Sequence, residues 1–241
     1  MTAQAERLLL AHERVRALES DVRARNIELE LCAKDPAYWL WNDQRYVWTR
    51  DEYDQNVPVK PFPYEPALET VLKEIHEGDQ QVTCVGKSRQ LTITWLICAY
   101  WSWWARFHAD QLLFIQSKKE EDAANLVFNK EPGMGRISFI EENLPWWMRQ
   151  NVKGSYGNLL YPNGSKIWGI PQGGDIIRSY TGSGLFADEA AFQPYCREAY
   201  RAAKACCRKI VLVSSAEGGS FFGQLSGFES GGLGSFGEGI G

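Results

Sequence analysis

The stretch QVTCVGKSRQLTITW, residues 81–95, decides the fold of this chain. It begins with a short apolar run typical of a buried strand, and it ends in a longer apolar run, typical of a helix, that continues to about Phe107. Between the two runs lies a loop that contains Lys87 and Arg89. Because the N-terminus of a helix presents unpaired N–H groups and a positive dipole end, a basic loop at this place favours an anion. The stretch therefore predicts a phosphate-binding loop between a strand and a helix; the alternative is a basic turn without a ligand.

Three further apolar runs predict strands, and they alternate with segments that predict helices. These runs are QLLFIQS (111–117), GLFADEAA (184–191) and KIVLVSSA (209–216). A helix is expected to begin within SKKEEDAANLV, where Ser117 and Glu120 match a capping box. The segment NLLYPNGSKIWGI (158–170) predicts a hairpin that turns at Asn163-Gly164. Strands that alternate with helices predict an α/β fold with a mostly parallel sheet flanked by helices.

The loop departs from the usual phosphate-binding pattern G-x-x-x-x-G-K-[ST]. Thr92 and Ile93 stand where that pattern has glycine and lysine. Thr92 and Thr94 supply hydroxyls, one of which is expected to reach a Mg²⁺ ion. In an open parallel sheet, ligands bind beyond the carboxyl ends of the strands, which is where this loop is expected.

Acidic and hydroxyl side chains follow two other strands at the same expected edge. Asp188 and Glu189 end one strand, and Ser214 and Ser215 end the next. In such an acid pair, one carboxylate holds magnesium and the other orients and deprotonates an attacking water. The serine hydroxyls are placed to sense the terminal phosphate of a nucleotide. The alternative treats these side chains as ordinary strand-end residues, but their order after a phosphate loop favours a nucleotide hydrolase.

The ends of the chain differ from this central region. Residues from Thr2 to about Ala33 place apolar side chains at helical spacing, which predicts one amphipathic helix. A helix docked along the domain is favoured over a partner-binding arm. An aromatic-rich, irregular connection follows, and the last residues are rich in glycine. We therefore predict a helical arm and connection at 1–50, a nucleotide-binding domain at 51–226 and a flexible tail at 227–241.

The composition argues against several classes of protein. A net charge of −4 and an acidic pI argue against a static DNA-binding surface, although not against a motor that contacts DNA locally. The six cysteines lack C-x-x-C spacing, which predicts reduced thiols rather than a zinc site or a disulfide scaffold. The N-terminus lacks an apolar secretory region, and the apolar run at 91–107 is shorter than the roughly 20 residues of a membrane span. These features predict a soluble intracellular protein.

Taken together, these motifs resemble the ATPase domain of the large terminase subunit, the viral DNA-packaging motor of tailed bacteriophages. The phrase KSRQLTITWL is similar to that family's variant phosphate loop, in which the lysine stands at the front, here at Lys87. The resemblance continues through ENLPWWMR, the hairpin, LFADEAAF and VLVSSAEGGSFFGQL, and it covers roughly Asp35 to Leu225. It implies a RecA-like P-loop (ASCE) NTPase fold behind an N-terminal helical arm.

The resemblance also implies a role for each site residue. Asp188 and Thr94 would hold Mg²⁺, and Glu189 would be the catalytic carboxylate. Ser214 and Ser215 would couple hydrolysis to movement. The nucleotide-binding loop would comprise Lys87, Ser88, Arg89, Gln90, Leu91, Thr92, Ile93 and Thr94.

The family's function further implies that the chain hydrolyses ATP to drive double-stranded DNA into a procapsid. Arg178, ten residues before Asp188, would enter a neighbouring subunit's site as an arginine finger, and the alternative is a surface ion pair. That role implies a homo-oligomeric ring on the portal protein. The small terminase subunit would be a further partner, and the machinery would work in the host cell cytoplasm and be absent from the mature virion.

The sequence also bears on other activities and on alternative functions. Only three carboxylates follow Ser215, so no nuclease activity is expected in this chain. Another nucleic-acid translocase or a helicase is one alternative function. A non-catalytic assembly module with a decayed nucleotide site is another, which Thr92 and Ile93 favour and the Asp188-Glu189 pair opposes.

Overall fold

The computed structural model describes Arg14 and residues 16–51, 56–87, 92–131, 134–215 and 219–227. The start of the predicted N-terminal helix and the glycine-rich tail from 228 onward lie outside these residues. None of the helices in the described ranges has the length and apolar character that a membrane crossing requires.

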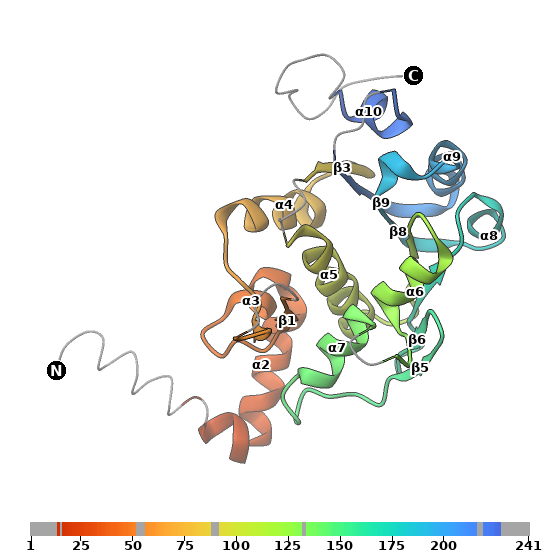
Figure 1. Ribbon diagram of the computed structural model, residues 1–241. Coiled ribbons are helices and arrows are strands. Elements are labelled where there is room, and N and C mark those ends of the chain that lie inside the picture. The colour runs from red at the N-terminus through yellow and green to blue at the C-terminus, as the bar shows by residue number, and fades with distance from the viewer. Residues whose placement is uncertain are drawn as a thin grey trace.

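A seven-stranded sheet forms the centre of the molecule (Figure 1). Five adjacent strands are parallel, and two antiparallel strands extend one edge. In spatial order the strands are β3 (Val82–Gly86), β9 (Cys207–Ser214), β8 (Gly182–Asp188), β4 (Leu112–Gln116), β7 (Lys166–Ile170), β6 (Asn158–Leu160) and β5 (Lys153–Ser155). The predicted α/β fold with a mostly parallel sheet is therefore confirmed.

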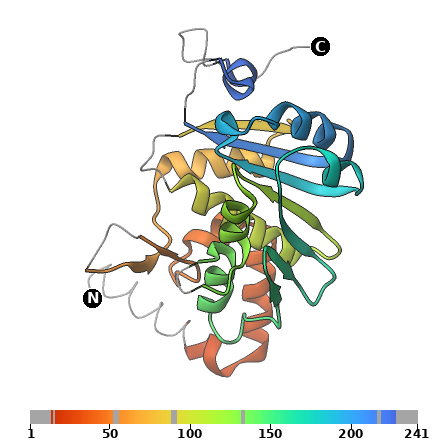
Figure 2. The ribbon, with the colours of Figure 1, turned by 45° about the vertical axis from the view of Figure 1, so that its right-hand side comes forward.

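The parallel strands are apolar along their whole length because helices cover both faces of the sheet. Leu185 and Phe186, neighbours in β8, belong to two separate hydrophobic clusters on opposite faces. One face packs on α4 (Pro66–Glu77), α5 (Ile93–Phe107), α6 (Glu120–Val127) and α7 (Arg136–Asn143); the other packs on α8 (Asp175–Arg178), η1 (Ala190–Phe192), α9 (Cys196–Cys206) and α10 (Phe221–Ser226). Figures 1 and 2 show α5 on one side of the sheet and α8 with α9 on the other.

Helix α5 runs through the larger of the two clusters. Twelve of its fifteen residues are buried, so it is apolar on nearly every side rather than amphipathic. Its one buried arginine, Arg106, pairs with Glu141 of α7 and donates to the Met148 carbonyl. Glu141 also accepts hydrogen bonds from Ser102 and Tyr161, which satisfies a charge that would otherwise be costly to bury. Because of this packing, the amino end of α5 is fixed against the sheet.

The prediction of one continuous helix from Thr2 to Ala33 is wrong at Asp21. Residues 16–20 are helical, and Asp21 then adopts an extended backbone. Its carboxylate accepts a hydrogen bond from the Arg23 N–H, so it caps a new helix, α2 (Val22–Lys34). The described part of this region docks on the domain as favoured, because Leu18 and Cys32 belong to the same hydrophobic cluster as α5.

The connection that follows is more ordered than predicted. It contains α3 (Pro36–Trp41), capped by Asp35, and a two-stranded ribbon of β1 (Trp48–Arg50) and β2 (Val59–Pro61). The proline at the first position of α3 fits a helix start, a signal that the aromatic character of the segment obscured. The division of the chain into an arm, a domain and a tail stays a prediction.

Two local predictions have opposite outcomes. The capping box at Ser117 and Glu120 is wrong, because α6 begins at Glu120 with Lys119 as its N-cap and without a side-chain cap. The hairpin at 158–170 is confirmed as β6 and β7, with Gly164 at a φ of 87° in the turn. Asn163 anchors this turn, since its amide donates to three carbonyls at the end of α5 and just beyond it.

Candidate functional site

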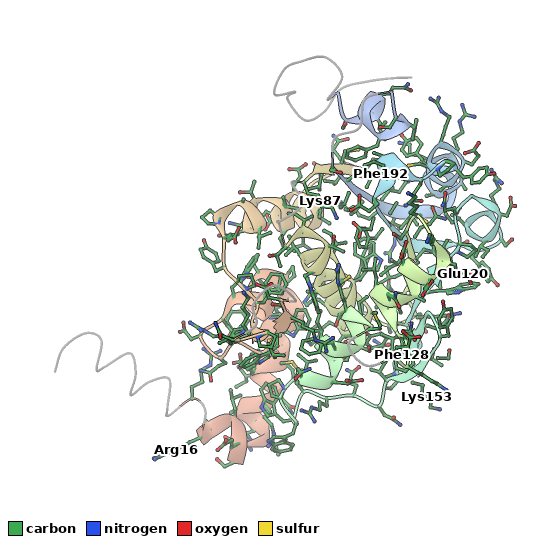
Figure 3. The ribbon with its side chains drawn as sticks, viewed as in Figure 1. Arg16, Lys87, Glu120, Phe128, Lys153 and Phe192 are labelled. Carbon is green, nitrogen blue, oxygen red and sulfur yellow. The ribbon has the colours of Figure 1, made fainter. Side chains whose placement is uncertain are left out.

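The predicted phosphate loop and the predicted acid pair meet at the carboxyl edge of the sheet. Lys87 follows β3, and Asp188 ends β8, with β9 between the two strands. Two strand spacings amount to about 10 Å, a gap that an extended lysine and an aspartate can close between them. The backbone N–H of Lys87 donates to the Ser214 carbonyl at 2.9 Å, which fixes the start of the loop on β9. Figure 3 shows Lys87 between the end of β3 and the start of α5.

The Lys87 ammonium points inward and contacts three oxygen-bearing side chains. Its Nζ lies 2.8 Å from Thr94 Oγ1, 2.9 Å from Asp188 Oδ1 and 3.2 Å from Glu189 Oε1. The Lys87 and Asp188 side chains are each 10% exposed. Thr94 is buried on the first turn of α5, and its hydroxyl lies 3.2 Å from Asp188 Oδ1. The structure thus brings together four residues that the sequence placed in one site.

The oxygens around the Lys87 ammonium suit a magnesium ion. Mg²⁺ prefers oxygen ligands and is commonly bound through one or two carboxylates plus substrate phosphates. Asp188, Glu189 and Thr94 supply two carboxylates and a hydroxyl at one point, and a cationic ammonium already sits among them. The residues present therefore fit a divalent cation.

Glu189 holds an unusual backbone conformation at the end of β8. Its φ of 54° and ψ of 40° lie in the left-handed region, which costs free energy for a residue with a Cβ. Two contacts fix the turn: Gln193 Nε2 donates to the Asp188 carbonyl at 2.7 Å, and the Ala191 N–H donates to Ser214 Oγ at 3.1 Å. Strained turns of this kind occur at functional sites, where the surrounding structure maintains them.

The two serines of the predicted coupling motif differ in their surroundings. Ser214 is fully buried, and its hydroxyl accepts the hydrogen bond from the Ala191 N–H in the turn after Glu189. Ser215 follows it and is partly exposed. Ser214 therefore ties the end of β9 to the backbone that positions Glu189. Gln193, which also holds this turn, was missed in the sequence, where a single glutamine after an apolar run gives no distinct signal.

Four of the predicted nucleotide-binding residues, Ser88, Arg89, Gln90 and Leu91, lie outside the described residues. Thr92 is the N-cap of α5 and makes no side-chain capping hydrogen bond. Ile93 is 3% exposed, and its side chain packs into the hydrophobic core. Its place in the nucleotide-binding loop stays a prediction. A lysine at position 93 would have to place its ammonium in the core. In this chain the lysine of the loop is Lys87.

A cleft of about 400 Å³ opens beside the acid pair. Asp188 and Glu189 form one part of its wall, together with Trp95 from the first turn of α5. Sequence reasoning missed its cationic lining residues, which are Arg50, Lys118 and Arg136. They come from three segments that no spacing in the sequence connects, so only the fold reveals that they face one cleft.

The structure does not bring Arg178 to this cleft within one chain. The residue ends α8, its side chain is 54% exposed, and it pairs with Asp175 at 2.8 Å. The adjacent Ile177 carbonyl lies 3.4 Å from Sγ of Cys206, the residue directly before the amino end of β9. The guanidinium lies beside Gly174, and Arg178 is not among the residues that line the cleft, so its role as a finger stays a prediction.

No protein-family model matches this chain. A search of curated protein sequences likewise gives no match. Solved structures do match, at low sequence identity. The large terminase of bacteriophage HK97 matches with a TM-score of 0.53 and 14% identity, over 66% of this chain and 34% of that protein.

Two further structures are similar but match less well. The ATPase domain of a Thermus phage large terminase has a TM-score of 0.49 at 14% identity, over 68% of this chain and 69% of that one. A large terminase from a thermophilic bacteriophage, in complex with ADP, has a TM-score of 0.47 at 16% identity, over 63% and 39% of the two chains. The chain spans about a third of the HK97 large terminase, and the described residues have the mixed α/β, RecA-like fold of that protein.

Proposed function

We propose that this chain is the ATPase motor domain of a phage large terminase and that it hydrolyses ATP in the presence of Mg²⁺. A fold alone does not imply a function, so the proposal depends on the site. The observation that supports it is the convergence of Lys87, Thr94, Asp188 and Glu189 at the carboxyl edge of the sheet. A cation, a hydroxyl and two carboxylates at this place are the groups that nucleotide hydrolysis requires.

Each of these residues has a distinct task in the proposed reaction. Glu189 accepts a proton from a water whose oxygen attacks the terminal phosphorus, as the bond from that phosphorus to the bridging oxygen of ADP breaks. Lys87 moves its ammonium from the carboxylates to the β- and γ-phosphates and neutralises their charge. Asp188 and Thr94 would hold Mg²⁺. The bound ion would neutralise charge on the phosphate oxygens.

The turn after Asp188 gives a route from chemistry to movement. Ser214 ends β9 and bonds the backbone of this turn, while the N–H of Lys87 bonds the carbonyl of the same serine. A displacement of this turn or of Lys87 would therefore act on the end of β9. We propose that this linkage, with Ser215 beside it, couples hydrolysis to translocation of double-stranded DNA.

The remaining proposed partners are those of a complete packaging motor. As part of a packaging motor, the chain would assemble as a ring on the portal of a procapsid and meet the small terminase subunit, in the host cell cytoplasm. A non-catalytic assembly module is the less supported function. Ile93, which stands where the usual loop has lysine, is buried in the core, and Lys87 brings a positive charge to the acid pair instead. A helicase would in addition separate strands.

The test is phosphate release by the purified chain, measured with and without Mg²⁺ and with and without double-stranded DNA. We expect release that requires Mg²⁺ and increases with double-stranded DNA, without strand separation on a forked substrate. Neither ATP binding nor phosphate release under any of these conditions would contradict the proposal. Strand separation at a comparable rate would favour the helicase.

A further inference from the structure

Two guanidinium groups that line the cleft beside Asp188 each lie over an aromatic ring. The Arg136 guanidinium lies 5.4 Å from the Trp95 ring centre, and the Arg50 guanidinium lies 4.4 Å from that of Phe139. The two rings meet edge to face at 5.8 Å. Contacts between a cation and an aromatic face hold a guanidinium in place without neutralising its charge. The two rings therefore orient two positive groups that line the cleft.

Arg136 lies where the dipole of its own helix disfavours a positive charge. It is the first residue of α7, directly after Gly135, where the positive end of the helix dipole repels a cation. Within the described part of the chain it makes no ion pair with a carboxylate. An anion between Arg136 and the rest of the cleft would relieve this repulsion.

The charges around the cleft leave room for such an anion. Its lining contains three cations, Arg50, Lys118 and Arg136, and three carboxylates, Asp122, Asp188 and Glu189. Two of these carboxylates, Asp188 and Glu189, already contact the Lys87 ammonium. Arg136 is thus not needed to balance the acid pair.

We propose that Arg136 is a phosphate-binding residue of this site, held on Trp95 and supplied by the same chain that supplies Glu189. This inference rests on the proposed ATPase function. Glu189, the proposed base, acts at the terminal phosphate and lines the same cleft as Arg136. The guanidinium therefore contacts the terminal phosphate of ATP, a group that ADP lacks. Arg136 is a discriminating contact in its own chain, independent of any finger donated by a neighbour.

The experiment compares Arg136→Ala and Arg136→Lys with Arg197→Ala. Arg197 is the matched control, because it too lies over a ring, 4.7 Å from the Phe221 centre, but on α9 and outside the cleft. Calorimetry measures binding of ADP and of a non-hydrolysable ATP analogue, both with Mg²⁺, and phosphate release measures turnover. Thermal unfolding checks that each variant is folded.

We expect Arg136→Ala to weaken binding of the ATP analogue roughly 10- to 100-fold, the scale of a hydrogen bond to a charged group, and to leave ADP binding within about twofold. Arg136→Lys should recover part of the loss, and Arg197→Ala should behave as the wild type. A purely structural role would weaken both nucleotides equally. If Arg136→Ala loses affinity for both nucleotides equally, or for neither, the inference is overturned. In that case nucleotide binding by the wild-type protein still supports the proposed function. Wild-type protein that binds neither nucleotide overturns both.

Discussion

The Lys87 ammonium lies 2.9 Å from the Asp188 carboxylate, and this ion pair spans the strand that separates the two residues in the sheet. Thr94 and Glu189 complete the surroundings of the ammonium. Of these groups, Asp188 and Thr94 are the ones proposed to hold Mg²⁺. In the proposed reaction, a metal–nucleotide complex would therefore have to displace the lysine toward the phosphates.

Removal of the ammonium should open this position to a divalent cation. In Lys87→Ala, two carboxylates lose their only described cationic contact, so Mn²⁺ should bind the nucleotide-free variant more tightly than the wild type. The same change should abolish ATP hydrolysis, because the phosphates lose their neutralising charge. Electron paramagnetic resonance of free Mn²⁺ measures the first effect. Lys73→Ala, an exposed lysine on α4, is the control, and equal Mn²⁺ binding in all three proteins would contradict the exchange.

Glu189→Gln should separate binding from chemistry. The amide keeps the size and hydrogen-bonding reach of the side chain but cannot take a proton at neutral pH. Turnover should fall by at least ~10²-fold, the scale of a lost general base, while ATP affinity stays close to that of the wild type. Single-turnover phosphate release and equilibrium binding measure the two quantities. A turnover within twofold of the wild type would remove Glu189 from the mechanism.

The left-handed backbone of Glu189 predicts that this residue lowers the free energy of unfolding. Glycine adopts a φ of 54° without steric cost, so Glu189→Gly should raise the free energy of unfolding by up to about 1 kcal/mol and abolish turnover. Arg45, with a φ of 51° and far from the acid pair in sequence, is the matched position. Arg45→Gly should stabilise the fold similarly without loss of turnover. Chemical denaturation gives the stabilities, and destabilisation by both changes would refute the strain argument.

The places of the main strands along the chain, the mostly parallel sheet and the four residues that meet at its edge followed from the sequence, because each depends on local patterns. Buried parallel strands read as short apolar runs, and Asp188 directly ends such a run. The break at Asp21 was missed because apolar spacing continues across it, while the decisive event is a single carboxylate bonding the Arg23 N–H. The cleft wall of Arg50 and Arg136 was missed because cation–aromatic contacts join segments that are distant in sequence.

His76 predicts a pH dependence of stability. Burial between Tyr100 and Trp103 lowers the pKa of its imidazole below the ordinary value, so the folded state holds this group neutral. The unfolded chain, with a pKa near 6.5, binds the proton more readily, and stability is lost as the pH falls from above 6.5 through the lower, folded pKa. His76→Phe should make denaturation midpoints less sensitive to pH between about 7.5 and 5.5. An unchanged pH slope in the variant would exclude His76 as the source.

Substitution of Arg178 tests whether the protein works as a ring. Its exposed guanidinium pairs with the fully exposed Asp175 and is not among the groups that line the cleft beside the acid pair. If the residue acts on a nucleotide, that nucleotide belongs to a neighbouring copy, and a finger donated in this way is worth roughly 10³ to 10⁵ in turnover. Arg178→Ala should therefore lower turnover of the assembled protein while leaving nucleotide affinity of dilute protein unchanged.

The mixing experiment decides between a donated finger and a surface ion pair. Arg178→Ala and Glu189→Gln should each be inactive alone, but mixed rings contain interfaces in which an intact Arg178 faces an intact Glu189, so activity should partly return. Asp175→Ala is the control: it removes the surface pair and keeps the arginine, so turnover should be maintained. Wild-type activity per molecule should also rise with protein concentration as rings form. If mixing restores nothing, activity is independent of concentration and Asp175→Ala has the same effect as Arg178→Ala, then the pair serves only the surface of α8.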